Sequence, residues 1–209
     1  MLHFNLSALS DLEKNYRTNL VNGISGGKPA CLIGTKNSSG INNLAIFSNI
    51  IHIGANPALI GILFRPLTDK NHTYQNIKSN PYFTLNHVQS NMIENAHFTS
   101  AKFPETISEF EACHLTPELL NEFHAPFVKE SSLKIGLSFK EEHFIHANDA
   151  ILLIGQVDHI FVPEEGIDSD GNVLLEKLKG ISVGGLNTYY ELSEIGKFPY
   201  AKVDQLPNF

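Results

Sequence analysis

Short apolar runs, broken at close intervals by turn residues, are the feature of this chain that most limits its fold. The runs are rich in branched residues or alternate apolar with polar positions, as β-strands do. Extended segments are predicted at 29–35, 41–53, 58–64, 82–88, 133–145 and 150–162. Because these segments do not alternate with long helices, a doubly wound parallel sheet fits poorly. We expect a mainly β fold, a closed or nearly closed antiparallel barrel with short helices.

Helical patterns are few and short. Ser10 and Glu13 have the spacing of a capping box, which predicts a helix over about 11–21. His72–Ser79 fits a short helix that Pro81 prevents from continuing. Further helical segments are expected at 92–101, at the start signal Thr116-Pro117-Glu118, and at 173–179.

The composition indicates one folded domain. Apolar residues make up 42% of the 209 residues and charged residues 18%, so a sizeable core can form. No internal repeat, low-complexity tract or linker interrupts the sequence, and residues 1–209 are predicted to form a single domain. The net charge is −7 and the cations are scattered, which argues against nucleic acid as a partner.

The sequence predicts a soluble, cytoplasmic protein. The first residues lack the basic region and long apolar core of a signal peptide. No run approaches the roughly 18 uninterrupted apolar residues of a membrane span, so no membrane association is expected. Cys31 and Cys113 lie far apart in apolar surroundings, and we expect buried thiols rather than a disulfide.

Three familiar kinds of site are not indicated. GISGGKP at 23–29 lacks the spacing of a P-loop and has Pro29 where Ser or Thr would bind magnesium. The histidines form no HExxH pattern and the cysteines no CxxC pattern, so no metal site is predicted. Ser48 has no evident base nearby in the sequence and lies in no G-x-S-x-G elbow. Catalytic side chains are therefore left unassigned.

A cluster of anion-binding groups follows the apolar run 58–64. Arg65 offers a planar fork of donors suited to phosphate. His72 and Thr73 begin a predicted helix, whose N-terminal backbone N–H groups attract anions. Together these groups predict a pocket for a terminal phosphate monoester. Taken alone, the segment is also what a surface arginine before an ordinary helix cap would look like.

Two further segments have the composition of a ligand site. In GINNLAIFSN at 40–49, polar residues bracket a small apolar centre, where Ala45 would let a flat ligand approach the backbone. In FTSAKF at 98–103, Thr99 and Ser100 bring hydroxyl groups and Lys102 a cation. Lys102 would serve either near a phosphate or near the pyrimidine edge of a flavin. A half-buried strand with polar ends and a helix end with a solvated lysine are the plain alternatives.

The order and spacing of these segments resemble the flavin reductase-like family. The matching patterns are GxxNLAxFS at 40–48, NPxLxxxxxRP at 56–66, HTYxNI at 72–77, TSAKF at 99–103 and GLNTYY at 185–190. The resemblance covers roughly residues 17–190. It implies an FMN-binding split β-barrel of antiparallel, Greek-key type. It also implies a homodimer with FMN near the subunit interface.

The resemblance places a cofactor site on this chain. Residues 43–48 would line the isoalloxazine, and Arg65 with His72 and Thr73 would hold the phosphate. Tyr189 would cover the ring or the nicotinamide position. The full predicted cofactor-binding set is Asn43, Leu44, Ala45, Ile46, Phe47, Ser48, Asn49, Arg65, His72, Thr73, Thr99, Ser100, Ala101, Lys102 and Tyr189.

The implied activity is hydride transfer from NADH or NADPH to FMN. The flavin carries this chemistry, and the protein supplies binding, orientation and tuning of the ring. No separate dinucleotide-binding domain is visible in the sequence, so NAD(P)H would dock directly onto the flavin face. Two alternatives stay open: a non-enzymatic FMN-binding or electron-carrier protein, and a barrel that binds another ligand or only a partner chain.

Overall fold

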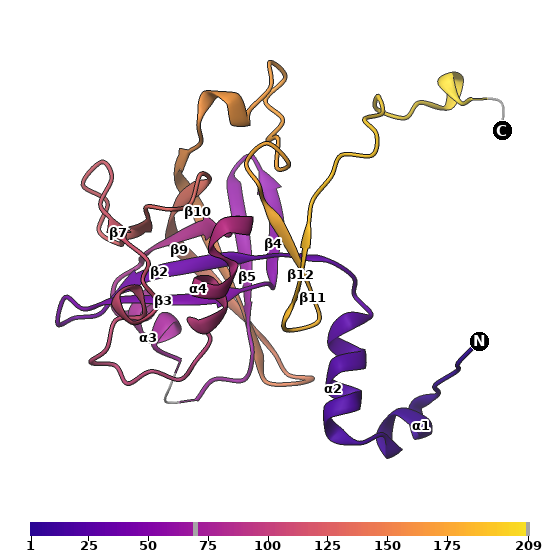
Figure 1. Cartoon of the computed structure of the whole chain (residues 1–209), viewed down its shortest axis with the longest axis horizontal. Helices are drawn as coiled ribbons and strands as arrows, with labels where there is room; N and C mark the ends of the chain where they lie inside the picture. Colours follow the sequence, from indigo (N-terminus) through magenta and orange to yellow (C-terminus); the bar gives the residue numbers. More distant parts are fainter. Residues whose placement is uncertain (69–70, 208–209) are drawn as a thin grey trace.

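A seven-stranded antiparallel sheet forms the centre of the molecule (Figure 1). The computed structural model describes residues 1–68 and 71–207. The strand order is β3-β2-β6-β9-β10-β5-β4, so β2 pairs with β6 and β5 with β10 across Greek-key connections. The strands are β2 (Cys31–Lys36), β3 (Asn42–Phe47), β4 (Ile50–Ala55), β5 (Ala58–Phe64), β6 (Tyr82–His87), β9 (Lys134–Ile145) and β10 (Ala150–Phe161). The predicted mainly β, antiparallel fold is confirmed.

The two edges of this sheet are joined by a very short connection. β3 ends at Phe47 and β4 begins at Ile50, and these strands are the opposite edges of the sheet. Two connecting residues span only about 10 Å. The sheet must therefore curl until its edges lie close together, which makes a barrel with a seam between β3 and β4. Ser48 and Asn49 lie at this seam.

A small antiparallel sheet lies beside the barrel. Its strand order is β1-β11-β12, with β1 at Lys28–Pro29, β11 at Ile181–Gly184 and β12 at Thr188–Glu191. The N-terminal β1 pairs with β11 near the C-terminus, so segments far apart in the sequence are joined here. β7 (Pro117–Glu118) and β8 (Phe127–Val128) form a separate two-stranded antiparallel sheet.

The helices agree with the predictions in some places and differ in others. α3 (His72–Ser79) has the predicted bounds, and α4 (Ile93–Phe98) is shorter than predicted. The N-terminal helix is divided into α1 (Leu6–Asp11) and α2 (Lys14–Gly23). The predicted capping box is wrong, because Glu13 itself is the N-cap of α2 and accepts hydrogen bonds from the backbone of Asn15 and Tyr16. α5 comprises Glu109–Ala112.

Two predicted helices do not form. The Thr116-Pro117-Glu118 signal leads into β7, because Pro117 and Glu118 pair with β8 instead. Val173 forms an isolated bridge with Ile167, and residues 175–179 form turns, where the backbone N–H of Leu178 bonds to the carbonyl of Leu174. Both predictions relied on local signals that pairing and packing overrode.

Two apolar clusters lie on the two faces of the central sheet. Alternate residues of β2 enter different clusters: Cys31 and Ile33 pack with Phe83 and Leu137, whereas Leu32 packs against α4 and α5. Such double burial explains the continuous apolar run of this strand. Cys31 and Cys113 are buried free thiols, as predicted. Burial raises the pKa of the Cys31 thiol to about 12, so this group stays protonated at neutral pH.

Within the described residues, the helices are too short or too polar to cross a membrane.

Candidate functional site

A cavity of about 590 Å³ opens at the rim of the barrel, beside the seam. Its walls come from the end of β3, the end of β5 with the start of α3, the segment after α4, and the hairpin of β11 and β12. Cavities of this size hold cofactor-sized ligands. The structure brings to this cavity every predicted site residue except Leu44: Asn43, Ala45, Ile46, Phe47, Ser48, Asn49, Arg65, His72, Thr73, Thr99, Ser100, Ala101, Lys102 and Tyr189.

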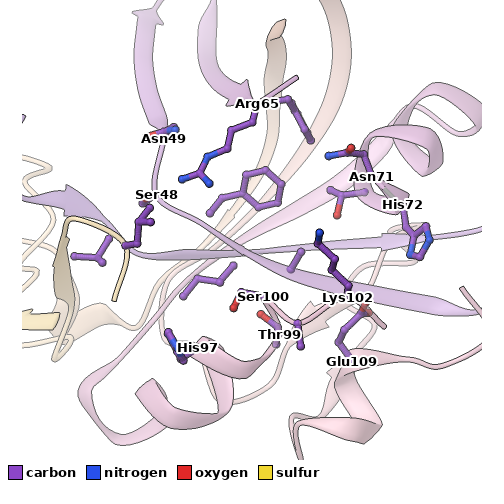
Figure 2. A pocket seen from close by; sticks show the side chains of 18 of the residues that line it. Ser48, Asn49, Arg65, Asn71, His72, His97, Thr99, Ser100, Lys102 and Glu109 are labelled. Atoms are coloured by element: carbon purple, nitrogen blue, oxygen red, sulfur yellow. The ribbon is translucent and has the colours of Figure 1, made fainter. Parts of the chain in front are cut away.

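The start of α3 forms one end of the cavity. Arg65 follows β5, and His72 and Thr73 open α3, so three donor-bearing side chains come from one short stretch (Figure 2). At the N-cap, Asn71 turns its Oδ1 back to accept from the backbone N–H and the hydroxyl of Thr68. Within the described part of the chain, Asn71 gives α3 no side-chain cap. The first turn of this helix is therefore suited to bind an anion.

Buried polar side chains hold α3 against the sheet. Asn43 Nδ2 donates to the hydroxyl oxygens of Thr35, at 3.2 Å, and Thr73, at 3.1 Å. Asn76 Nδ2 donates to the same Thr35 oxygen at 3.0 Å. These buried groups need such partners to offset the loss of water. The network fixes the start of α3 relative to β3. Asn43 therefore positions the part of the cavity wall that α3 forms.

Leu44 differs from its predicted neighbours. Its side chain is fully buried in the apolar cluster that includes Leu32 and Phe110. Side chains alternate along a strand, and this position of β3 faces the core. The predicted ligand contact for the Leu44 side chain is therefore not supported. Its backbone N–H instead donates to Glu109 Oε2 at 2.9 Å.

The segment after α4 supplies hydroxyl groups and a cation. Thr99 is buried, and its hydroxyl donates to the carbonyl of Ala96 at 2.7 Å, so it closes the end of the helix. Ser100 and Lys102 are exposed at the cavity mouth. Figure 2 shows Lys102 pointing toward the end of the cavity where Asn71 and His72 lie. Of the two roles considered for Lys102, this position favours the one near a phosphate.

Glu109 is a buried acid in the cavity wall that sequence reasoning missed. Its side chain lies at the N-terminus of α5, near Lys102 in Figure 2. Burial raises the pKa of the Glu109 carboxyl, and the Leu44 N–H and the charge of His72 oppose that shift. Ser108 before Glu109 is a recognisable helix start, but no local pattern connects this segment with β3, 65 residues earlier.

His97 and Tyr189 form a hydrogen-bonded pair at the other end of the cavity. His97 Nδ1 lies 2.9 Å from the Tyr189 hydroxyl, and the two rings meet edge to face at 5.8 Å. Burial raises the pKa of the Tyr189 phenol, which therefore remains a hydrogen-bond donor at neutral pH. The pair also borders a second, more open cavity of about 480 Å³ that shares Asn187. His97 gave no sequence signal, because it follows the apolar positions of α4 without a motif of its own.

The described residues contain no cluster of three or more His, Cys, Asp or Glu side chains that could hold a metal ion. The cavity instead combines cations, hydroxyl groups, helix N–H groups and the Glu109 acid with apolar side chains and the His97–Tyr189 pair. This arrangement suits an amphiphilic ligand with an anionic tail. The fold and site thus define a barrel, open along one seam, with a cavity at that seam whose lining suits an anionic ligand.

Comparison with known proteins places this barrel in a family. The flavin reductase like domain matches residues 26–176, so the chain belongs to the flavin reductase-like family. This match confirms the resemblance seen in the short motifs. The matched residues include both the seam and the start of α3.

Similar structures confirm the split barrel. A split-barrel protein of Shewanella frigidimarina NCIMB 400, assigned to the flavin reductases, is 39% identical with a TM-score of 0.93, covering 96% of this chain and 100% of that one. Nitrilotriacetate monooxygenase component B from Bacillus cereus, at 23% identity, shares the fold with a TM-score of 0.81, covering 95% of this chain and 98% of its own. An uncharacterized protein of Aquifex aeolicus (strain VF5) is 28% identical over 180 residues, which are 85% of this chain and 90% of the relative.

Proposed function

We propose that the cavity binds FMN and that the chain is an oxidoreductase that uses NADH or NADPH to reduce it. Membership of the flavin reductase-like family supports a flavin. The observation that carries the proposal is that Arg65, the uncapped start of α3 and Lys102 line one cavity. In Figure 2 the Arg65 side chain points toward Ser48 and Asn49 at the seam, and Lys102 points toward Asn71 and His72. A phosphate monoester needs such a set of cations and N–H donors.

The residues present fit the phosphate of FMN. Arg65 offers a bidentate fork, and the N-terminus of α3 offers aligned N–H groups and a partial positive charge. Thr73 lies in the same wall, where Asn43 fixes its hydroxyl oxygen. Lys102 adds a second cation from a different segment of the chain. These groups line one cavity and would together hold and orient the tail of the cofactor.

The residues at the seam fit the flavin ring. Ala45 is small, and Ile46 and Phe47 are partly buried, so a flat apolar surface can approach β3 closely. Ser48 and Asn49 bring polar groups to the same edge. When bound, the flavin supplies the hydride chemistry. The chain would exclude water from one ring face and leave the open side of the cavity for the nicotinamide.

We further propose that the protein acts as a homodimer in the cytoplasm. Two buried free thiols agree with a reducing compartment. Two copies would place the cavity of each near the subunit interface, as the family resemblance implies.

The test is an absorption spectrum followed by an anaerobic titration. The purified chain, supplied with FMN, is expected to bind it and to lose the visible flavin absorbance when NADH or NADPH is added. A bound flavin that stays oxidised in excess reduced nicotinamide would contradict the enzymatic proposal and leave an electron carrier. A chain that does not change the FMN spectrum at all would refute flavin binding.

A further inference from the structure

The C-terminal segment 193–207, here called the C-terminal arm, leaves the barrel as a stretch of coil that includes the short 3-10 helix η3 (Val203–Gln205) (Figure 1). All of its residues are exposed, including Phe198 and Tyr200, each at 88%. Ile195, Val203 and Leu206 are exposed as well. Exposed apolar area costs free energy in proportion to its size, so an arm of this composition requires a cover.

Among the described residues, the polar contacts between the arm and the rest of the chain are at its base. The Glu194 backbone N–H donates to Glu176, and Lys197 pairs with Asp168 at 2.9 Å. This pairing lowers the pKa of the Asp168 carboxyl and raises that of Lys197. These contacts fix the base of the arm, and the apolar residues Phe198, Tyr200 and Val203 that follow are exposed.

The N-terminal helices have the same lack of cover. Every residue of α1 and α2 is exposed or half-buried, and several of them are large and apolar. Exposed examples in the helices are Leu6, Tyr16 and Val21, and the flanking Leu2 and Ile24 are exposed as well. Figure 1 shows both ends of the chain leaving the barrel on the same side, where β4 also lies. Ile51 and Ile53 of this edge strand are exposed too.

We propose that a second copy of this chain covers the C-terminal arm. The arm of each copy would pack against the N-terminal helices of the other. In a two-fold dimer the same surface of each copy meets its equivalent on the other. Here one chain carries both an arm and N-terminal helices with exposed apolar side chains. Stable interfaces take about 20–30 residues from each side. The arm at 193–207 and the helices at 6–23 supply that number, and 15 residues reach at most about 50 Å.

The charges of the arm favour this partner over others. Glu194, Lys197, Lys202 and Asp204 balance, so the arm is neutral, whereas the whole chain carries −7. A neutral apolar segment can cross a second acidic copy without charge repulsion. Binding to nucleic acid or an anionic membrane would instead require clustered cations.

The proposal deepens the proposed homodimer by naming the segments that form it, and it links the partner to the cavity. The arm follows β12 directly, and Tyr189 on β12 is a wall of the cavity. A partner that fixes the arm would also fix the strand that carries the His97–Tyr189 pair.

Sedimentation of the full-length chain tests the arm. The variant Phe198→Asp/Tyr200→Asp is expected to raise the dimer dissociation constant at least tenfold. Ser193→Asp/Gln205→Asp is the matched control, because it adds the same charge to the arm and keeps its apolar residues. The control is expected to dissociate no more than threefold more easily than the unmodified chain. A double variant that dimerises as tightly as the control overturns the role of the arm.

Hydrogen exchange of the unmodified chain gives a second measurement that needs no variant. Arm amides are expected to exchange at least tenfold more slowly above the dimer dissociation constant than below it, because a monomer leaves the arm in water. Free exchange of the arm in the dimer would overturn the inference. An unmodified chain that is monomeric at all concentrations would overturn the homodimer as well, while FMN binding by the same sample would leave the flavin proposal standing.

Discussion

Arg65 is one of the groups proposed to contact the phosphate of FMN. Charge-assisted hydrogen bonds contribute about 1.5–3 kcal/mol each. Arg65→Ala is therefore expected to weaken FMN binding by roughly ten- to a hundredfold. Riboflavin, which lacks the phosphate, should bind the variant nearly as well as the unmodified chain. Fluorescence titration with both ligands measures the difference.

Lys140→Ala is the control for this change. Lys140 is an exposed cation on β9 that lies outside the residues lining the cavity. It should leave both flavin affinities unchanged. Equal losses of FMN and riboflavin in the Arg65 variant would contradict a phosphate contact at this residue.

His87 makes stability depend on pH. Burial lowers its pKa from 6.5 to about 4, so the folded chain binds a proton there less readily than the unfolded chain. The stability from this group is fully present above pH 6.5 and is lost as the pH falls toward 4. The loss amounts to about 3 kcal/mol. Urea unfolding between pH 7 and 4 measures it.

The matched variants for this prediction are His87→Gln and His146→Gln. The first removes the titrating group, so its stability should change less with pH across this range. The second changes an exposed histidine and should keep the slope of the unmodified chain. Identical slopes in all three proteins would show that His87 is not the titrating group.

Strand β2 is the element with the least room for change. A Cβ at Gly34 would collide with the Pro126 carbonyl oxygen and lie 2.6 Å from Thr84 Oγ1, which itself donates to that carbonyl. The carbonyl belongs to the backbone and cannot move aside cheaply. Gly34→Ala should therefore cost about 3 kcal/mol of unfolding free energy or more. Chemical denaturation measures this, with Gly23→Ala, which meets nothing within 4 Å, as control.

The elements show how far local patterns predict this fold. The bounds of α3 could be read from the sequence, because Pro81 and the polar start of the segment agree with its packing. Pro117 looked like a helix start, but its pairing with Val128 decided the outcome. Pairing between distant segments is a tertiary property that no single window of sequence contains.

The site follows the same rule. Arg65 and His72 lie within one stretch and were found together, whereas Glu109 reaches the cavity only because α5 packs on β3. His97 likewise enters the site through contact with Tyr189, 92 residues later. Motifs therefore located the parts of the cavity made by consecutive residues and missed those brought in by folding.

On the scale of the whole molecule, a ligand that binds only the folded chain stabilises all of it. FMN at a hundred times its dissociation constant is expected to add about 2.7 kcal/mol. For a chain of this size, that corresponds to a rise in melting temperature of roughly 5–10 °C. Differential scanning calorimetry with FMN measures the shift, and the Arg65→Ala variant at the same FMN concentration should show a smaller one. An equal shift in both proteins would contradict the proposed site.

The residues that line the cavity run from 43 to 189, a span of 147 of the 209 residues. A ribosome must therefore extend the chain past residue 189 before a complete binding site exists. Cofactor binding would thus be a late event of biogenesis. Prematurely terminated chains that lack β12 would have an incomplete cofactor site.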